Sequence, residues 1–227
     1  MAIPAYNEAQ TVAGVVRGVR EHRPHDTIMV VDDGSRDATA DEAASHDAKV
    51  VQLPFNTGVG AAMRTAFLYA ARNDYDALVQ VDADGQHDPV SIKSLLDGLD
   101  TASVVVGARG ESLPVRGPRK WAMVMLAKVL SRIVGEPLTD VTSGFRAADR
   151  RAIELYARDY PSEYLGDTVE SLVVASRAGL AVAQVDVTMR PRQGGRASQG
   201  PIMASAYLMR AALALVVALS RGRGARL

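Results

Sequence analysis

With 227 residues, 48 % of them hydrophobic, the chain is long enough for one large domain or two small ones around a sizeable buried core. Lysine plus arginine equals aspartate plus glutamate at 26 each, so no net charge attracts nucleic acid, and we expect no nucleic-acid partner. The absence of cysteine excludes disulfides, zinc–thiolate sites and thiol catalysis. It is consistent with a cytoplasmic protein, and the first residues do not read as a signal peptide.

Short apolar, β-rich runs alternate with helical periodicities over the first half of the chain. Strands are expected at residues 1–5, 27–31, 50–53, 77–81 and 104–106, and helices at 12–19, 36–46, 63–70 and 92–99. This alternation predicts an α/β fold with a mostly parallel central sheet and helices on both faces. Polar clusters follow four of these strands, at 6–8, 32–33, 82–84 and 107–109. Ligands bind outside the carboxyl ends of parallel strands, so these clusters predict a site at four neighbouring strand ends.

The second half of the chain has a different pattern. We expect helices at 120–134, 150–156 and 168–178, a loop at 140–146, a strand at 181–187 and an Arg- and Gly-rich loop at 190–200. Residues 202–219 form an apolar run interrupted by Arg210. A membrane span needs ~20 apolar residues, and an arginine at mid-depth costs roughly 2.5 kcal/mol or more, so an interfacial or core-packed helix is favoured.

Charge is distributed unevenly along the chain. Most acidic residues precede Asp100 and none follows Asp186. Seven arginines come after it: Arg190, Arg192, Arg196, Arg210, Arg221, Arg223 and Arg226. One part of the molecule is therefore suited to a cation and another to anions, including phosphate and membrane headgroups.

Asp82 and Asp84 end an apolar strand and are separated by one alanine. In an extended chain they share a face, where two carboxylates repel each other unless a cation lies between them. Oxygen ligands, with Gln86 nearby, favour Mg²⁺ or Mn²⁺ over zinc. A solvated turn is the alternative interpretation. Arg192 and Arg196, in a glycine-rich loop, are interpreted as phosphate ligands rather than ordinary surface charges.

Seven ordered motifs together resemble the family 2 glycosyltransferases, and most closely their dolichol-phosphate mannosyltransferase and polyprenyl-phosphate glycosyltransferase branch. They lie at residues 3–8, 31–35, 56–60, 82–86, 107–109, 143–146 and 192–195. The resemblance covers essentially the whole chain and implies the GT-A fold. Two departures are visible: only three residues precede Pro4, where the family has several more apolar residues, and the lysine expected after Arg192 is replaced, with Arg196 as the substitute charge.

The resemblance also implies roles for individual residues. The nucleotide sugar would be bound by Pro4, Tyr6, Glu8, Val31, Asp33, Asp82 and Ala83, and the divalent cation by Asp82, Asp84 and Gln86. Acceptor or donor phosphate would contact Arg109, Ser143, Arg146, Arg192 and Arg196, with Asp84, Arg109 and Arg192 as catalytic residues. Residues 1–200 would form the catalytic domain, including an interfacial helix at about 118–134 that receives the lipid. Residues 201–227 would form a membrane-associated helix and tail.

The implied reaction is an inverting transfer of a hexose from GDP-mannose or UDP-glucose to a polyprenyl or dolichyl phosphate. The protein would lie at the inner face of the cell membrane as a peripheral protein, and a second copy of the chain, in a homo-oligomer, is among the expected partners. A phosphate monoester, with a second pKa near ~6, needs no strong base. A sugar-hydroxyl acceptor would need one, for which Asp140, Asp167 and Glu170 are candidates. The remaining alternatives are a nucleotidyltransferase and a nucleotide-sugar-binding protein with an idle site.

Overall fold

The computed structural model describes residues 1–109, 118–161 and 167–191. Arg192, Arg196 and the expected apolar helix at 202–219 lie outside these residues, as does most of the expected loop at 190–200. No helix within the described part of the chain is both long and apolar enough to cross a membrane.

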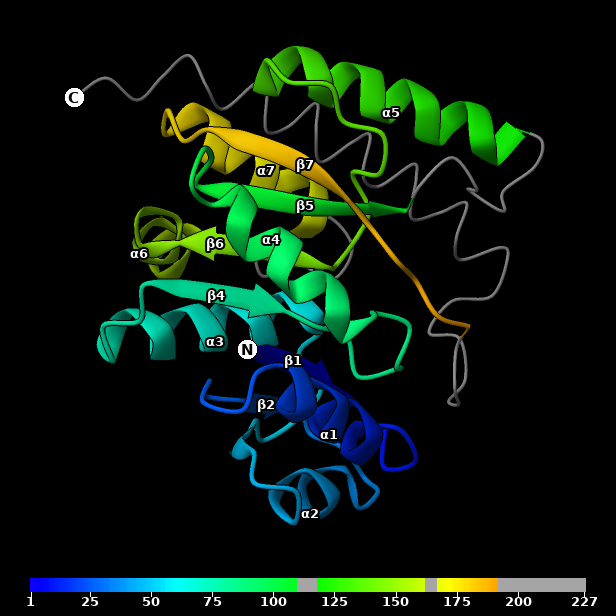
Figure 1. Cartoon of the computed structure of the whole chain (residues 1–227), viewed down its shortest axis with the longest axis vertical. Coiled ribbons are helices and arrows are strands. Elements are labelled where there is room, and N and C mark those ends of the chain that lie inside the picture. Colours follow the sequence, from blue (N-terminus) through cyan, green and yellow to red (C-terminus); the bar gives the residue numbers. More distant parts are fainter. Residues whose placement is uncertain (110–117, 162–166, 192–227) are drawn as a thin grey trace.

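The described residues form one seven-stranded sheet with the strand order β3-β2-β1-β4-β6-β5-β7 (Figure 1). Its strands are β1 Ala2–Ala5, β2 Met29–Asp32, β3 Lys49–Gln52, β4 Ala77–Gln80, β5 Val104–Arg109, β6 Arg146–Asp149 and β7 Val182–Val187. Every neighbouring pair is parallel except those made by β6, which runs antiparallel to both β4 and β5. The predicted α/β class and mostly parallel sheet are confirmed.

Helices cover both faces of the sheet, and a separate hydrophobic core lies between the sheet and the helices on each face. One face carries α1 Val12–His22, α2 Thr39–Ala44, the short 3₁₀ helix η1 Pro89–Ser91 and α4 Ile92–Gly98. The other carries α3 Val59–Arg72, α5 Pro118–Val134, α6 Arg150–Asp159 and α7 Asp167–Arg177. Successive side chains of β5 alternate between the two cores, as an extended strand requires: Val104 and Val106 enter one and Val105 the other.

Strand β6 is the element that the sequence does not predict. Its four residues include two alanines and no β-branched residue, a composition that favours helix over strand. Its backbone is nevertheless paired on both sides. Ala148 of β6 lies opposite Leu78 of β4, and Ala147 of β6 lies opposite Val105 of β5. Tertiary pairing therefore overrides local preference. The expectation that the ends of β1, β2, β4 and β5 are neighbours is wrong in one respect, because β6 lies between β4 and β5.

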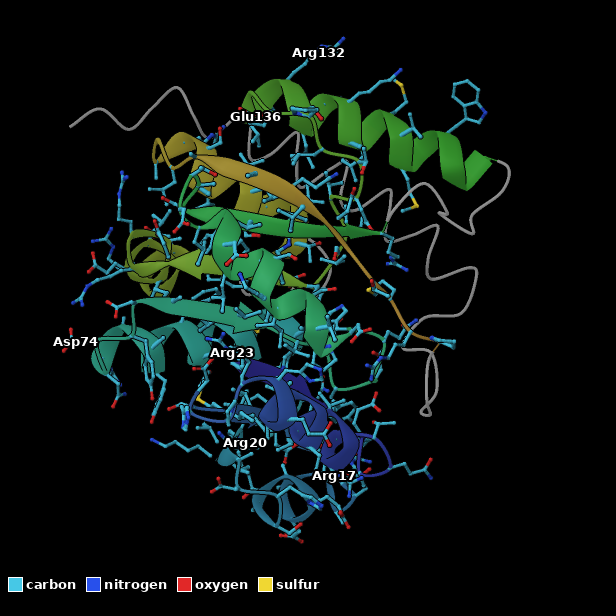
Figure 2. All side chains as sticks on the ribbon, in the orientation of Figure 1. Arg17, Arg20, Arg23, Asp74, Arg132 and Glu136 are labelled. Atoms are coloured by element: carbon cyan, nitrogen blue, oxygen red, sulfur yellow. The ribbon has the colours of Figure 1, made fainter. Side chains whose placement is uncertain are left out.

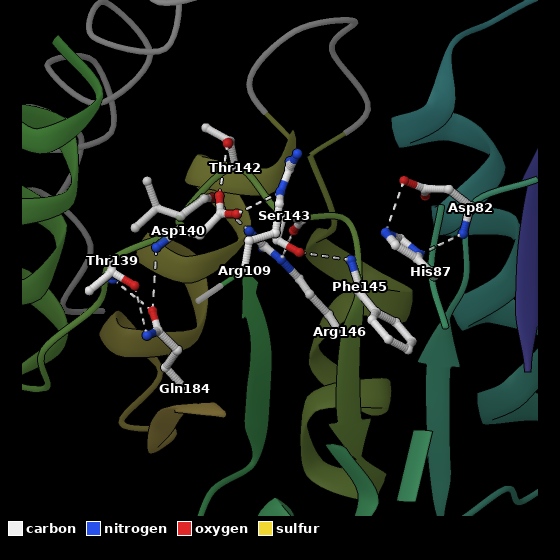
Figure 3. A network of polar contacts seen from close by, with 11 residues as sticks. Asp82, His87, Arg109, Thr139, Asp140, Thr142, Ser143, Phe145, Arg146 and Gln184 are labelled. Atoms are coloured by element: carbon white, nitrogen blue, oxygen red, sulfur yellow. Dashed lines mark hydrogen bonds and ion pairs between the residues drawn. The ribbon is translucent and has the colours of Figure 1, made fainter. Parts of the chain in front are cut away.

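The direction of β6 has a consequence for the site. Because β6 runs antiparallel to β4 and β5, it begins at the edge of the sheet where those two strands end. The loop that leads into β6, residues 140–146, therefore lies beside the carboxyl ends of β4 and β5. This places the Ser143–Arg146 motif between the Asp82 cluster and Arg109 (Figure 3).

Candidate active site

The loops that follow β1 and β2 are joined to each other by hydrogen bonds. The backbone N–H of Asn7 donates to Ser35 Oγ at 2.9 Å, and the backbone N–H of Arg36 donates to Asn7 Oδ1 at 2.9 Å. Asn7 adopts φ 55°, a left-handed conformation that asparagine tolerates. Beside this junction Tyr6 remains 41 % exposed, which leaves its ring available to a ligand.

Glu8 begins the turn into α1. Its carboxylate accepts a hydrogen bond from Thr11 Oγ1 at 2.7 Å, and its backbone N–H donates to Thr39 Oγ1 at 2.9 Å. The residue is half-buried. The structure thus brings Tyr6 and Glu8 together at the carboxyl end of β1.

Asp33 is used within the protein. It is 3 % exposed, and its carboxylate accepts hydrogen bonds from Thr57 N, Thr57 Oγ1 and Gly58 N at 2.8, 2.8 and 2.7 Å. The negative charge lies at the N-terminus of α3, where the helix dipole favours it. Asp33 therefore holds the loop at 54–58 in place. Its carboxylate is already hydrogen-bonded to that loop, so it is not free for the expected direct contact with a nucleoside.

Gly34 lets this loop approach β2 closely. It has φ 71°, and a Cβ atom there would lie 2.6 Å from the backbone carbon of Phe55. Two further residues expected to touch the nucleotide sugar are buried: Val31 is 0 % exposed and Ala83 is 3 % exposed. Their side chains belong to the core, because each occupies an inward position at a strand end. Pro4 is half-buried and lies opposite Val31 in the sheet.

Asp82 and Asp84 lie on the turn that follows β4. The Asp82 side chain is 38 % exposed, whereas Asp84 is 9 % exposed and its Oδ1 accepts a hydrogen bond from the backbone N–H of Gln86 at 3.0 Å. The chain turns at residues 83–84, helped by Gly85 at φ 75°, so the two carboxylates do not sit on an extended strand. Their shared location on one short turn is what the structure shows.

The Asp82 carboxylate is held from several directions, one of which is the ring of His87 (Figure 3). Gln80 Nε2 donates to Oδ1 at 3.3 Å, and His87 Nε2 lies 3.5 Å from Oδ2. The backbone of Gly144 lies directly against it, since a Cβ atom on Gly144 would be 2.9 Å from both carboxylate oxygens. A side chain at this position would therefore require the Asp82 carboxylate and the Gln80 amide to move.

These residues suit a hard divalent cation. The donors are carboxylate and amide oxygens, and Asp82 is partly open to solvent. Within the described ranges no group of three or more His, Asp or Glu side chains forms a complete cage. Mg²⁺ and similar ions are commonly bound by one or two carboxylates together with substrate phosphates, so a partial protein site fits a cation that arrives with a diphosphate.

Arg109 lies on the other side of β6 from Asp82. Its Nε donates to Asp140 Oδ2 at 3.2 Å, and the Arg109 side chain is 36 % exposed while Asp140 is 1 % exposed. Thr142 Oγ1 donates to the other oxygen of Asp140 at 3.1 Å, and Gln184 Oε1 accepts from the backbone N–H of Thr139 at 2.7 Å. The ion pair with Asp140 orients Arg109, while part of the Arg109 side chain remains accessible to an anion.

Arg146 and Ser143 are buried instead, at 8 % and 3 % exposure. Arg146 Nε donates to Ser143 O at 2.7 Å, Nη1 to Thr168 O at 2.6 Å and Nη2 to Val141 O at 2.8 Å. Ser143 Oγ accepts from the backbone N–H of Phe145 at 3.2 Å. The guanidinium is thus occupied by backbone carbonyls, and both residues hold the 140–146 loop rather than offering free groups to a phosphate.

Asp167 is a buried acid at the start of α7. It is 3 % exposed, and its Oδ2 has no hydrogen-bond partner among the described residues. Burial raises the pKa of its carboxyl group from 3.8 to about 6, opposed by the positive charge of Arg146 and supported by the negative charge of Asp82. Of the three candidate bases, Asp140 is paired with Arg109 and Glu170 is half-buried on α7.

The segment after β7 is attached to the turn that carries the carboxylates. The backbone N–H of Arg190 donates to Gln86 O at 2.8 Å, and its Nη2 lies 2.8 Å from Asp88 Oδ1. Met189 forms a β-bridge with His87. The chain that continues to Arg192 therefore starts beside the candidate cation site.

Sequence reasoning assigned no role to His87, Gln80 or Gly144. A signal exists for His87, a polar residue immediately after the Asp-Ala-Asp-Gly-Gln run. Gly144 lies within the motif at 143–146, but its contact with Asp82 follows only from the approach of β6 to β4. Gln80 is two residues before Asp82, so its contact is local, although no sequence pattern marks it.

A mostly parallel α/β sheet with Tyr6 and Glu8 after β1, two carboxylates after β4 and an arginine across β6 is the arrangement of a GT-A type glycosyltransferase fold. The profile of Glycosyl transferase family 2 matches residues 1–156, and the chain belongs to this family. It is a glycosyltransferase.

Two relatives and one solved structure illustrate the similarity. The undecaprenyl-phosphate mannosyltransferase of Micrococcus luteus is 34 % identical over 208 residues, covering 85 % of this chain and 84 % of the relative. The polyprenol monophosphomannose synthase of Mycolicibacterium smegmatis is 34 % identical over 209 residues, covering 85 % and 77 %. The fold matches that of glucosyl-3-phosphoglycerate synthase from Mycobacterium tuberculosis, crystallised with Mn²⁺, UDP and glucosyl-3-phosphoglycerate. The TM-score is 0.71 at 23 % identity, covering 96 % of this chain and 78 % of that one.

Proposed function

We propose that this glycosyltransferase moves a hexose from a nucleotide sugar to the phosphate of a polyprenyl lipid, with inversion at the anomeric carbon and with a divalent cation. The observation that carries the proposal is the division of one sheet edge into two chemically opposite halves. Asp82 and Asp84 form the half suited to a cation, and Arg109 forms the half suited to an anion. The 34 % identical relatives are named for transfer to undecaprenyl phosphate and polyprenol phosphate, which supports the acceptor class.

On the donor side, Asp82, Asp84 and Gln86 would hold the cation, and Tyr6 and Glu8 would flank the nucleoside. When bound, the cation supplies positive charge that stabilises the departing nucleoside diphosphate. Asp33 acts indirectly, since it fixes the 54–58 loop beside this pocket. Mn²⁺ in the solved structure of similar fold supports a divalent ion and leaves Mg²⁺ equally suitable.

On the acceptor side, the lipid phosphate is the nucleophile. Its second pKa near ~6 leaves it largely ionised at neutral pH, so it attacks without a strong base. The new bond joins the phosphate oxygen to the anomeric carbon from the face opposite the nucleoside diphosphate, and the bond to that diphosphate breaks. Arg109, oriented by Asp140, would place the phosphate and reduce repulsion between the two anionic substrates. Arg192 and Arg196 would add to this positive charge.

The lipid would reach the site from a membrane surface on the α5 side. Trp121, Met125, Lys128 and Arg132 follow one another at intervals of four, three and four residues, so they lie along one side of α5. Trp121 is 74 % and Met125 56 % exposed, and Lys128 and Arg132 are exposed too, with Arg132 pointing away from the body of the protein (Figure 2). An apolar half followed by a basic half suits an anionic bilayer surface, and we propose peripheral attachment at the inner face of the cell membrane.

A sugar-hydroxyl acceptor is the second candidate. It is favoured by one observation: Oδ2 of Asp167 has no hydrogen-bond partner in the described ranges, and the carboxyl group feels the charge of Asp82. A carboxylate with a pKa of about 6 is suited to accept a proton from a hydroxyl near neutral pH.

The test is metal-dependent transfer from radiolabelled GDP-mannose or UDP-glucose to a short polyprenyl phosphate. Asp82→Asn and Asp84→Asn should each lower the rate by roughly 100-fold or more, since even residues that only support metal ligands cost 10–100-fold. Asp97→Asn, on the exposed side of α4, is the matched control and should retain wild-type activity. Unchanged rates in both site variants would contradict the cation site. The Asp167→Asn variant is assayed with both acceptors. If it loses transfer to a sugar hydroxyl but keeps transfer to the lipid phosphate, the second candidate is supported.

A further inference from the structure

His87 contacts Asp82 through both nitrogens of its ring. Nδ1 lies 2.9 Å from the backbone nitrogen of Asp82, and Nε2 lies 3.5 Å from Asp82 Oδ2. A backbone N–H only donates, so Nδ1 accepts this hydrogen bond and carries no proton. In a neutral imidazole the proton is then on Nε2, where it faces the carboxylate. One side chain thus spans the amide and the carboxylate of the same residue (Figure 3).

The ring itself is held firmly. His87 is 5 % exposed, and its ring stacks on Phe145 with centroids 4.5 Å apart and planes 9° from parallel. Its backbone forms a β-bridge with Met189. Because Phe145 belongs to the same loop as Gly144, the stack also connects His87 to the backbone that adjoins Asp82.

One hydrogen bond and one close contact with a ring nitrogen give the Asp82 carboxylate a defined orientation. A carboxylate has about four lone-pair sites, two on each oxygen. Gln80 Nε2 uses one on Oδ1, and His87 Nε2 is directed at one on Oδ2. Two contacts do not use all of these sites, and the side chain is 38 % exposed, so the carboxylate is accessible to an external cation.

We infer that His87 is a positioning residue for the cation: its Nε2–H fixes the Asp82 carboxylate in the orientation that a divalent ion requires. The inference rests on the proposed function, since it concerns the same cation. It extends that function to a residue that touches neither donor nor acceptor. The matching physical principle is general, because carboxylates that bind metals are themselves oriented by hydrogen bonds.

A purely structural role for His87 predicts something different. If the ring mattered only for packing on Phe145, then any substitution that keeps the fold would leave cation affinity unchanged. Three variants separate the two roles. His87→Gln places an amide donor near the position of Nε2, His87→Asn reaches only the position of Nδ1, and His87→Phe keeps an aromatic ring on Phe145 without either nitrogen.

The experiment measures Mn²⁺ affinity by the electron paramagnetic resonance signal of the free ion, on the full chain with saturating UDP or GDP. His87→Asn and His87→Phe should bind Mn²⁺ roughly 10–100-fold more weakly, and His87→Gln should stay within about threefold of wild type. Circular dichroism confirms that each variant is folded. At saturating Mn²⁺ the kcat of the Asn variant should recover, while its KM for Mn²⁺ stays raised.

The outcomes are distinct. Wild-type Mn²⁺ affinity in folded His87→Asn would overturn the positioning role and leave the proposed function intact. A loss in His87→Gln as large as in His87→Asn would also overturn it, because a donor at Nε2 would then be irrelevant. Wild-type protein that binds no Mn²⁺ with either nucleotide would overturn the proposed function itself, and this inference with it.

Discussion

At Gly144 the absence of a side chain is a requirement of the site. A Cβ atom would lie 2.9 Å from both oxygens of Asp82 and 3.0 Å from Gln80 Nε2. Gly144→Ala should therefore displace the carboxylate, lower cation affinity and reduce the free energy of unfolding by about 1–3 kcal/mol. Urea denaturation measures the change in the free energy of unfolding.

The matched control for that substitution is Gly14→Ala in α1. Nothing lies within 4 Å of a Cβ atom at Gly14, and alanine is the better helix former by about 0.8–1.0 kcal/mol. This variant should be more stable than wild type. Equal effects of the two substitutions would contradict the close approach of the 140–146 loop to Asp82.

Asp167 predicts a dependence of stability on pH. Its pKa is about 6 in the folded protein and 3.8 as an isolated group, so between these values the folded state binds more protons than the unfolded state. The free energy of unfolding should therefore fall as pH rises from about 4 to 6 and remain lower above it. Asp167→Asn removes this term and should be more stable than wild type at pH 7.5, on the order of 1–3 kcal/mol.

Urea unfolding at pH 4 and pH 7.5, with EDTA present, measures this difference between Asp167→Asn and wild type. The gain should be largely absent at pH 4, where the wild-type carboxyl group is protonated in the folded protein. Glu136→Gln, at an exposed position after α5, is the control (Figure 2). The same gain at both pH values would show that the buried charge is not its cause.

Residue identities at the strand ends were predictable, but their partners were not. The positions of Asp82, Asp84 and Arg109 follow from local pattern, because a polar residue after an apolar run marks the end of a strand. The use of Asp33 to hold Thr57 and Gly58, and of Arg146 to hold backbone carbonyls, depends on loops distant in sequence. A motif shows that a charge is needed at a position; it does not show whether the ligand or the protein uses it.

At the scale of the element, α5 is testable as a membrane contact. Trp121→Ala combined with Met125→Ala should weaken binding to vesicles of phosphatidylglycerol and phosphatidylcholine by roughly 10-fold or more, since a buried large apolar side chain contributes about 1.5–3 kcal/mol. Cosedimentation measures the partition coefficient. Lys128→Gln with Arg132→Gln should weaken binding only when the vesicles are anionic, by about 1 kcal/mol per charge.

The control for α5 is Phe55→Ala. Phe55 is 65 % exposed but follows β3, at the opposite edge of the sheet from β7. Its loss should leave vesicle binding unchanged. Wild-type binding by the Trp121 and Met125 double variant would place the membrane contact on another part of the chain.

Elements with strong periodicity were predictable, and the weakly patterned one was not. The helix expected at 120–134 is α5, and the strand expected at 181–187 is β7. Strand β6 has no alternating pattern of its own, and it exists because β4 and β5 each offer a free backbone edge. The sequence of β6 alone therefore does not predict a strand, because its pairing depends on β4 and β5.

At the scale of the whole molecule, the sheet order divides the protein into two parts that meet at β6. Strands β3, β2, β1 and β4 carry the residues proposed for the nucleoside and the cation, and β5 and β7 lead to Arg109 and to the segment that ends at Pro191. The order was not predictable from the sequence, because the pairing of β6 on both sides is a long-range property. The overall class was, because alternation of strand and helix is local.

The 140–146 loop touches both parts at once, through Gly144 beside Asp82 and Asp140 beside Arg109. Arg146 fastens it internally by hydrogen bonds to carbonyl groups. The loop therefore links the position of the Asp82 carboxylate to that of Arg109 through a short backbone segment. Under the proposed function, this segment would set the distance between the bound cation and the acceptor phosphate, whatever side chains surround the base, the sugar or the lipid.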